Sequence, residues 1–73
     1  MMAARQVYWL SPLGAADDFG IPIAQEFVDG KTRLGPWAIM APSSFKIMGV
    51  GLGLGRGQRY VRQVDGRWLK VEG

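Results

Sequence analysis

Residues 26–41 read Glu-Phe-Val-Asp-Gly-Lys-Thr-Arg-Leu-Gly-Pro-Trp-Ala-Ile-Met-Ala, and this stretch decides the fold class. Partial alternation over residues 22–28 predicts a strand. Asp29-Gly30 then predicts a two-residue hairpin turn, because both central positions of that turn prefer a positive φ. A return strand over 31–34 would end at Gly35-Pro36, and the apolar run of residues 37–41 predicts a buried strand.

The flanking segments predict further short elements around this centre. Residues 6–10 are β-branched and aromatic, which favours a strand, and Ser43 could cap a short helical turn that reaches Met48. Asp65-Gly66 predicts a second hairpin in which facing residues have numbers that sum to 131, so that Tyr60 faces Val71. The sequence therefore predicts a small β-rich fold of two or three hairpins.

Between the two hairpins, glycine occupies every second position from 49 to 57. The spacing fits neither the Gly-x-Gly-x-x-Gly loop of dinucleotide sites nor the Gly-Lys-Ser/Thr of phosphate loops, so we interpret the run as a connector. It divides the chain into a compact β body over 1–48 and a glycine-rich connector with a basic segment over 49–73. Whether that segment is an ordered hairpin or a disordered C-terminal tail stays open, because an isolated hairpin is marginal in water.

The composition narrows the classes of function. The 73 residues include no Cys and no His, which excludes disulfides, thiolate or imidazole metal ligands and Ser-His-Asp triads. We therefore expect no enzyme, no catalytic residues, no cofactor and no bound metal. The start of the chain has no apolar signal-peptide core, and no stretch reaches 18 apolar residues, so we expect an intracellular protein with no membrane contact.

Charge is concentrated in the second part of the chain, since six Lys and Arg stand against two acidic residues over 46–73. Basic residues interleaved with aromatic ones are typical of single-strand binding, where charge follows the backbone and rings stack on bases. The competing interpretation is a solvated hairpin with Trp68 packed on the body. The predicted nucleic-acid-facing residues are Arg56, Arg59, Tyr60, Arg62, Arg67, Trp68 and Lys70.

Three stretches of the chain resemble a group of very small bacteriophage zinc-ribbon proteins. They are Phe27-Val28-Asp29-Gly30-Lys31-Thr32, then Gly35-Pro36-Trp37-Ala38-Ile39-Met40, and the glycine run. In those proteins a Cys-x-x-Cys pair precedes the Asp-Gly and another follows Gly-Pro-Trp-Ala. The matching positions here are Ala16 and Phe19, then Ala41 and Ser44, none of which is a thiolate. The resemblance implies a degenerate, metal-free ribbon. We expect apolar side chains to fill the vacated space, namely Trp9, Phe19, Phe27, Trp37, Ile39 and Phe45.

Within that group the chain is similar to the small regulators with which lytic Xanthomonas phages bind host RNA polymerase. The similarity implies a monomer in the host cytoplasm that binds a polymerase subunit, inhibits initiation and promotes antitermination, with the basic segment near nascent RNA. Two alternatives are a single-stranded nucleic-acid-binding module that acts without polymerase and a structural protein of the virion. The predicted protein-binding residues are Val7, Trp9, Glu26, Phe27 and Arg33.

Overall fold

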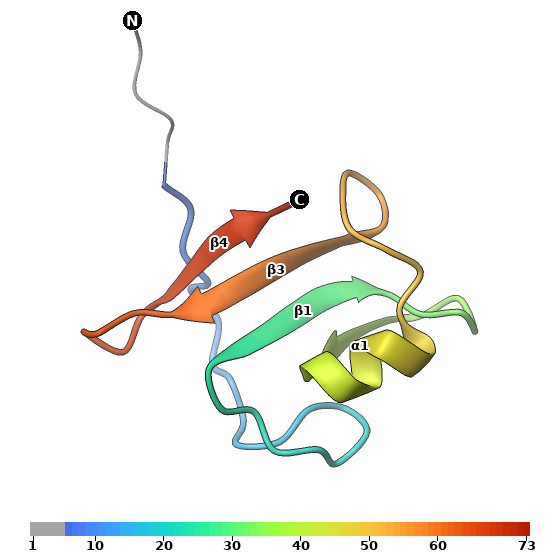
Figure 1. Ribbon diagram of the computed structural model, residues 1–73, viewed down its shortest axis with the longest axis horizontal. Helices are drawn as coiled ribbons and strands as arrows, with labels where there is room; N and C mark the ends of the chain where they lie inside the picture. Colours follow the sequence, from blue (N-terminus) through green and yellow to red (C-terminus); the bar gives the residue numbers. More distant parts are fainter. Residues whose placement is uncertain (1–5) are drawn as a thin grey trace, which may run out of the picture.

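A computed structural model describes residues 6–73 and shows one open antiparallel sheet of four strands with one short helix (Figure 1). The strands lie in the order β2-β1-β3-β4. This confirms the predicted small β-rich fold. The elements in chain order are β1 (Glu26–Lys31), β2 (Trp37–Met40), α1 (Pro42–Met48), β3 (Gly57–Arg62) and β4 (Trp68–Glu72).

The first hairpin joins β1 to β2, but its turn is not at Asp29-Gly30. Asp29 faces Ile39 and Gly30 faces Ala38 in the middle of the ladder, so the predicted turn is wrong. The chain reverses at residues 32–36, where the Thr32 N–H donates to the Pro36 carbonyl at 3.0 Å. Gly35, with a φ of 109°, is the last of the three residues, 33–35, that lie between this bonded pair.

Gly30 serves a different purpose from the one that its Asp-Gly pair indicates. It faces Gly57 on β3, and a Cβ at Gly30 would lie 2.9 Å from the Arg56 carbonyl oxygen. Two glycines opposite each other let the backbones of β1 and β3 come close together here. A glycine that is needed for close approach looks the same in the sequence as one that is needed for a turn.

The second hairpin joins β3 to β4 where the sequence predicted it, and it repeats the turn geometry of the first. The Gln63 N–H donates to the Arg67 carbonyl at 2.7 Å, and Gly66 has a φ of 89°. This loop is one residue longer than a two-residue turn. Tyr60 therefore faces Lys70 instead of Val71, which corrects the predicted register by one residue.

The C-terminal part of the chain is not a separate tail. β3 pairs with β1 on one side and with β4 on the other, so residues 57–72 belong to the same sheet as residues 26–40. The predicted division at residue 48 has no counterpart in this sheet, and residues 1–5 of the predicted body lie outside the described part. Of the two alternatives left open for this segment, the structure shows the hairpin, formed by β3 and β4.

An aromatic cluster of Trp9, Phe27, Tyr60 and Trp68 forms the core on one face of the sheet. Phe27 and Tyr60 are register partners, and their rings stack with centroids 5.1 Å apart. The Trp9 ring packs edge-on against both, and Trp68 packs edge-on against Phe27. In the predicted strand over 6–10, Tyr8 forms a single bridge to Leu69 on β4, which holds Trp9 over the cluster.

Helix α1 lies in front of β1 and β2 in Figure 1, and the N-terminal segment passes behind the sheet. The predicted helical turn is confirmed, but Pro42 is its first residue and Ala41 is the N-cap. Ser43 makes no capping bond, which corrects the predicted cap. Gly49 ends the helix, where any side chain would collide with the Phe45 ring.

Candidate functional site

The predicted protein-binding residues do not form one surface. Phe27 is 0% exposed, so a partner cannot reach its side chain, and Trp9 packs against it. Phe27 is therefore corrected to a core residue, whereas Trp9 is half-buried beside it. Glu26 is paired with Arg59 at 3.0 Å. Val7 beside β4 and Arg33 in the β1–β2 turn are exposed at opposite sides of the sheet.

The predicted nucleic-acid-facing residues are also divided among different roles. Tyr60 is only 5% exposed, so its ring is not available for base stacking, and that assignment is corrected. Burial raises the pKa of its hydroxyl, and the charge of Asp29 adds to this shift. Trp68 is half-buried against Phe27. This agrees with the competing interpretation, a solvated hairpin with Trp68 packed on the body.

Two of the predicted cations are engaged by carboxylates. Arg59 lies between Glu26 and Glu72, with Nη1 3.0 Å from the first carboxylate and Nε 2.7 Å from the second. Arg67 pairs with Asp65 at 2.8 Å. The remaining three, Arg56, Arg62 and Lys70, form no ion pair within residues 6–73.

Asp17 joins two loops through its side-chain carboxylate, and the sequence did not predict this role. Its Oδ1 accepts hydrogen bonds from the N–H groups of Phe19 and Ile21, at 2.9 and 2.8 Å. Its Oδ2 accepts the Ala41 N–H at 2.8 Å, and the Ser44 side chain bonds to the same carboxylate. Asp17 is buried. An aspartate in a turn commonly accepts a hydrogen bond from the N–H two residues ahead. This preference is the sequence signal from which the role of Asp17 could have been predicted.

The electrostatics of Asp17 follow from these bonds. Burial by itself raises the pKa of the carboxyl, but the bonds from Ser44, Ala41, Ile21 and Phe19 outweigh it and lower the pKa below its ordinary value. The neighbouring Asp18 extends the junction, because its Oδ2 accepts the Ile39 N–H at 2.7 Å. Asp17 and Asp18 therefore join the first loop to the edge of β2.

Three of the four positions that match the cysteines of zinc ribbons, Phe19, Ala41 and Ser44, bond to this carboxylate, and the fourth, Ala16, is its neighbour in the chain. Ala16 and Phe19 precede β1, while Ala41 and Ser44 follow β2, and an antiparallel hairpin brings those two ends together. The rings do not fill the space as predicted, since Phe19 is 44% exposed and Trp37 is 49% exposed. Within residues 6–73, no group of three or more acidic residues is placed to hold a metal ion.

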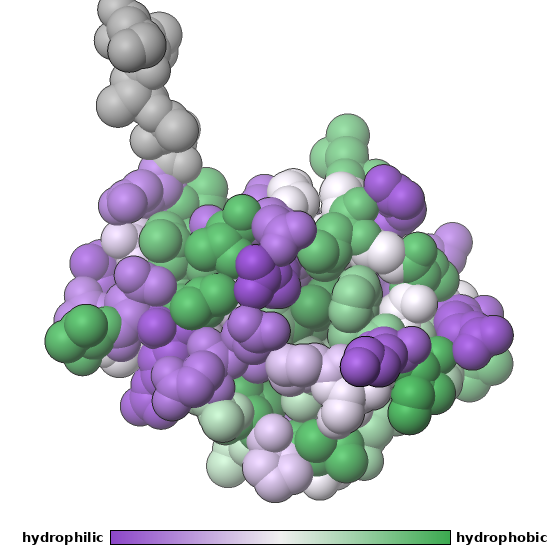
Figure 2. Space-filling view, viewed as in Figure 1, coloured by the Kyte–Doolittle hydropathy of each residue, from purple (hydrophilic) through white to green (hydrophobic). Residues whose placement is uncertain are grey.

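An apolar groove lies between this first loop and α1. It has a volume of about 240 Å³. Ile47 on the helix is 64% exposed, and Figure 2 shows hydrophobic residues gathered over α1 and the loop beside it. A concave surface of this kind favours contact with an apolar partner segment. Its lining residues are Phe19, Ile21, Ser43, Ser44, Ile47 and Met48.

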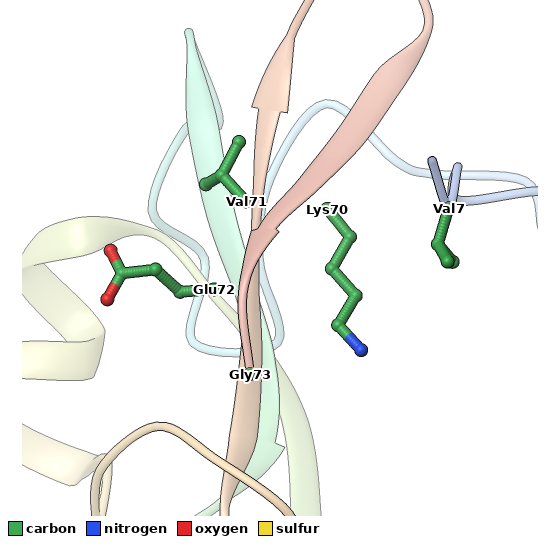
Figure 3. Close-up of a pocket in the computed structure, with 5 residues that line it drawn as sticks. All are labelled: Val7, Lys70, Val71, Glu72 and Gly73. Atoms are coloured by element: carbon green, nitrogen blue, oxygen red, sulfur yellow. The ribbon is translucent and has the colours of Figure 1, made fainter. Parts of the chain in front are cut away.

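A second, polar hollow of about 210 Å³ lies at the end of β4. Figure 3 shows Val7 and Lys70 on one side of the strand, whereas Val71 and Glu72 point to the other side. The Lys70 ammonium group and the Glu72 carboxylate are therefore turned away from each other. This arrangement does not form an acid–base pair, which requires both groups within reach of one substrate atom.

No family model, curated protein or solved structure matches this chain. The groove, the Asp17 junction and the distribution of charge are therefore interpreted from their own chemistry. No helix in residues 6–73 is both long and apolar enough to cross a bilayer.

Proposed function

We propose that this protein is a phage regulator that binds the RNA polymerase of its bacterial host, inhibits initiation and promotes antitermination. It acts in the host cytoplasm as a binding protein and not as an enzyme. The resemblance to small polymerase-binding regulators supplies the partner. The apolar groove beside α1 is the observation that carries the proposal, because it offers a surface for protein contact on a very small scaffold.

The groove offers both apolar area and flanking charge. Phe19, Ile21 and Ile47 are each at least two-fifths exposed, and burying about 100 Å² of such surface contributes roughly 2.5 kcal/mol. Lys46 precedes Ile47 on the helix, and the Arg33 guanidinium donates to the Ile47 carbonyl at 3.1 Å. The complementary partner is a polymerase segment with an apolar anchor and acidic neighbours.

The proposed mechanism requires only a difference in affinity between two states of the polymerase. A ligand shifts a conformational equilibrium by the difference in its binding free energy for the two states. A difference of about 1–3 kcal/mol changes the equilibrium between about 5-fold and 150-fold. A protein of 73 residues can supply this from one groove, without chemistry of its own.

Ile47→Asp tests the groove in a binding titration with purified Xanthomonas RNA polymerase. Burying the new carboxylate against an apolar anchor is unfavourable, so we expect the affinity to fall at least about tenfold. Ile47 is largely exposed, so the fold should tolerate the change. Val64→Asp is the matched control, because Val64 is fully exposed in the β3–β4 turn away from the groove. Equal affinities of the two variants would exclude the groove as the docking surface.

We also propose that the two loops joined by Asp17 are a zinc-ribbon site in which a carboxylate has replaced the metal. This proposal is supported by the order of loop, β1, β2 and loop, and by the bonds that members of both matched pairs, Phe19 and then Ala41 and Ser44, make to one carboxylate.

Restoring the ligands tests this origin. We expect the variant A16C/D17A/F19C/A41C/S44C to bind one Co²⁺ per chain, with the visible absorption of a tetrahedral thiolate site. The single variant D17A, which lacks thiolates, is the control. Absence of a tetrathiolate spectrum in a folded five-fold variant would refute the proposed origin.

A further inference from the structure

We propose that the end of the β1–β2 hairpin binds the phosphates and bases of a single-stranded nucleic acid. The residues concerned differ from those that the sequence predicted. Three cations lie on segments that are joined at this end, and the half-exposed Trp37 ring is the register partner of one of them. These hairpin-end cations are Lys31, Arg33 and Arg56.

Backbone hydrogen bonds join the separate segments that carry these cations. The Lys31 N–H donates to the Arg56 carbonyl at 2.7 Å, which places the end of β1 against the start of β3. The Arg33 N–H donates to the Met48 carbonyl at 2.8 Å, which places the turn against the end of α1. Figure 2 shows hydrophilic residues at this end of the molecule, interspersed with hydrophobic ones at the turn and at the tip of the glycine loop.

The charge of this end is not cancelled by carboxylates. Within residues 6–73 the ion pairs involve Arg59 and Arg67, and none involves a hairpin-end cation. Asp29, two residues before Lys31, is the nearest carboxyl along β1; burial and the charge of Asp18 raise its pKa. The positive charge that remains is therefore available to phosphate groups.

The glycine run keeps one of these cations uncovered. Gly51 and Gly53 lie under the Arg56 side chain, and a Cβ at Gly53 would come within 3.1 Å of its Nη2. Both glycines also have a positive φ, which side-chain-bearing residues rarely adopt. The alternating glycines therefore give the guanidinium a bare backbone surface to lie on, and Arg56 is exposed.

Trp37 provides the stacking surface that Tyr60 cannot provide. It is 49% exposed and is the register partner of Lys31, so the ring and the ammonium group project from adjacent positions on the same sheet face. A ring beside cations is the combination that binds single strands without sequence preference. The source of the strand rests on the proposed function, under which it is the nascent RNA of the bound polymerase.

The test is an anisotropy titration of a labelled 12-nucleotide oligouridylate with the full chain, without polymerase. If about three phosphates are neutralised, the slope of log affinity against log salt is about −2. Affinity should then fall roughly 20-fold between about 50 and 200 mM salt. No binding by the wild-type chain at the lower salt would overturn the inference.

Two double variants with the same net charge separate a local site from general electrostatics. We expect K31E/R56E to lose at least about tenfold in affinity and to have a shallower salt slope. R62E/K70E, which reverses two unpaired cations elsewhere, should lose much less. Equal losses, or a larger loss in R62E/K70E, would overturn the inference. Thermal melts establish that both variants are folded.

Trp37→Ala tests stacking, and it should weaken binding about tenfold without changing the salt slope. An unchanged affinity would overturn the role of the ring. Ile47→Ser removes apolar area from the groove without changing the net charge, and it separates this inference from the proposed function: it should keep wild-type affinity for the oligonucleotide while binding polymerase more weakly. Loss of oligonucleotide affinity in I47S would place the strand in the apolar groove and contradict the hairpin-end site.

Discussion

Replacing Phe27 by alanine is expected to leave little folded protein at 37 °C. The side chain is 0% exposed and contacts the rings of Trp9, Tyr60 and Trp68, so truncation leaves a cavity in the core. Such changes cost about 3–5 kcal/mol. A domain of this size has a total stability of about 4–11 kcal/mol. Urea unfolding followed by tryptophan fluorescence measures the loss.

Phe19→Ala is the matched control for this prediction. It removes the same ring, but Phe19 is 44% exposed at the groove, so we expect the free energy of unfolding to fall by about 1 kcal/mol or less. The comparison also decides which rings stabilise the protein. A larger loss for F19A than for F27A would restore the hypothesis that a ring fills the vacated metal position.

Replacing Asp17 by alanine is expected to lower the free energy of unfolding by about 2–4 kcal/mol. The substitution removes the acceptor for the N–H groups of Phe19, Ile21 and Ala41, and hydrogen bonds to charged groups contribute about 1.5–3 kcal/mol each. Phe19 and Ile21 are exposed, so water replaces part of what their N–H groups lose, and the total is smaller than the sum of three bonds. Hydrogen exchange of those three amides should rise with the loss of stability, because they would be left without their partner. Chemical denaturation and amide exchange by NMR measure both effects.

The pH dependence of this contribution has a definite sign. The pKa of Asp17 is lower in the folded chain than its ordinary value of 3.8, so folding favours the ionised carboxylate. The stabilisation is complete above about 3.8 and is lost as the pH falls through the lower, folded pKa. The difference in stability between the wild type and Asp17→Asn should therefore be constant at neutral pH and shrink below 3.8.

Asp65→Ala is the control for position 17. Asp65 also accepts a main-chain N–H two residues ahead, from Arg67, but it lies in an exposed turn and joins no second loop. We expect a stability change of about 1 kcal/mol or less. If D17A and D65A destabilise equally, Asp17 is an ordinary turn residue and the proposed replacement of metal by carboxylate is wrong.

Local signals in the sequence predicted several elements correctly. The apolar run at Trp37 forms β2 as predicted, and Asp65-Gly66 lies in the turn of the second hairpin. The turn of the first hairpin was predicted wrongly because glycine has two structural roles that look the same in a sequence. Gly30 looked like a turn glycine but permits close approach of β1 and β3, while Gly35 makes the turn.

The candidate sites depended on contacts that the sequence does not show. The basic C-terminal segment looked like one surface, but strand pairing places Arg59 between Glu26 and Glu72 and buries Tyr60. The sequence could not show that Asp17 joins two loops, because its partner across the hairpin, the Ala41 amide, lies 24 residues away. The segments that carry the hairpin-end cations are joined only after the sheet has formed, so charge counting along the chain could not group them.

Single-round transcription tests the proposal that the chain regulates a bacterial RNA polymerase by binding it. A template with a strong promoter and an intrinsic terminator is transcribed by purified Xanthomonas RNA polymerase with and without the protein. We expect fewer initiated transcripts when the protein is added before initiation, and more read-through when it is added to elongating complexes. Unchanged initiation and unchanged termination at saturating protein would contradict the proposal.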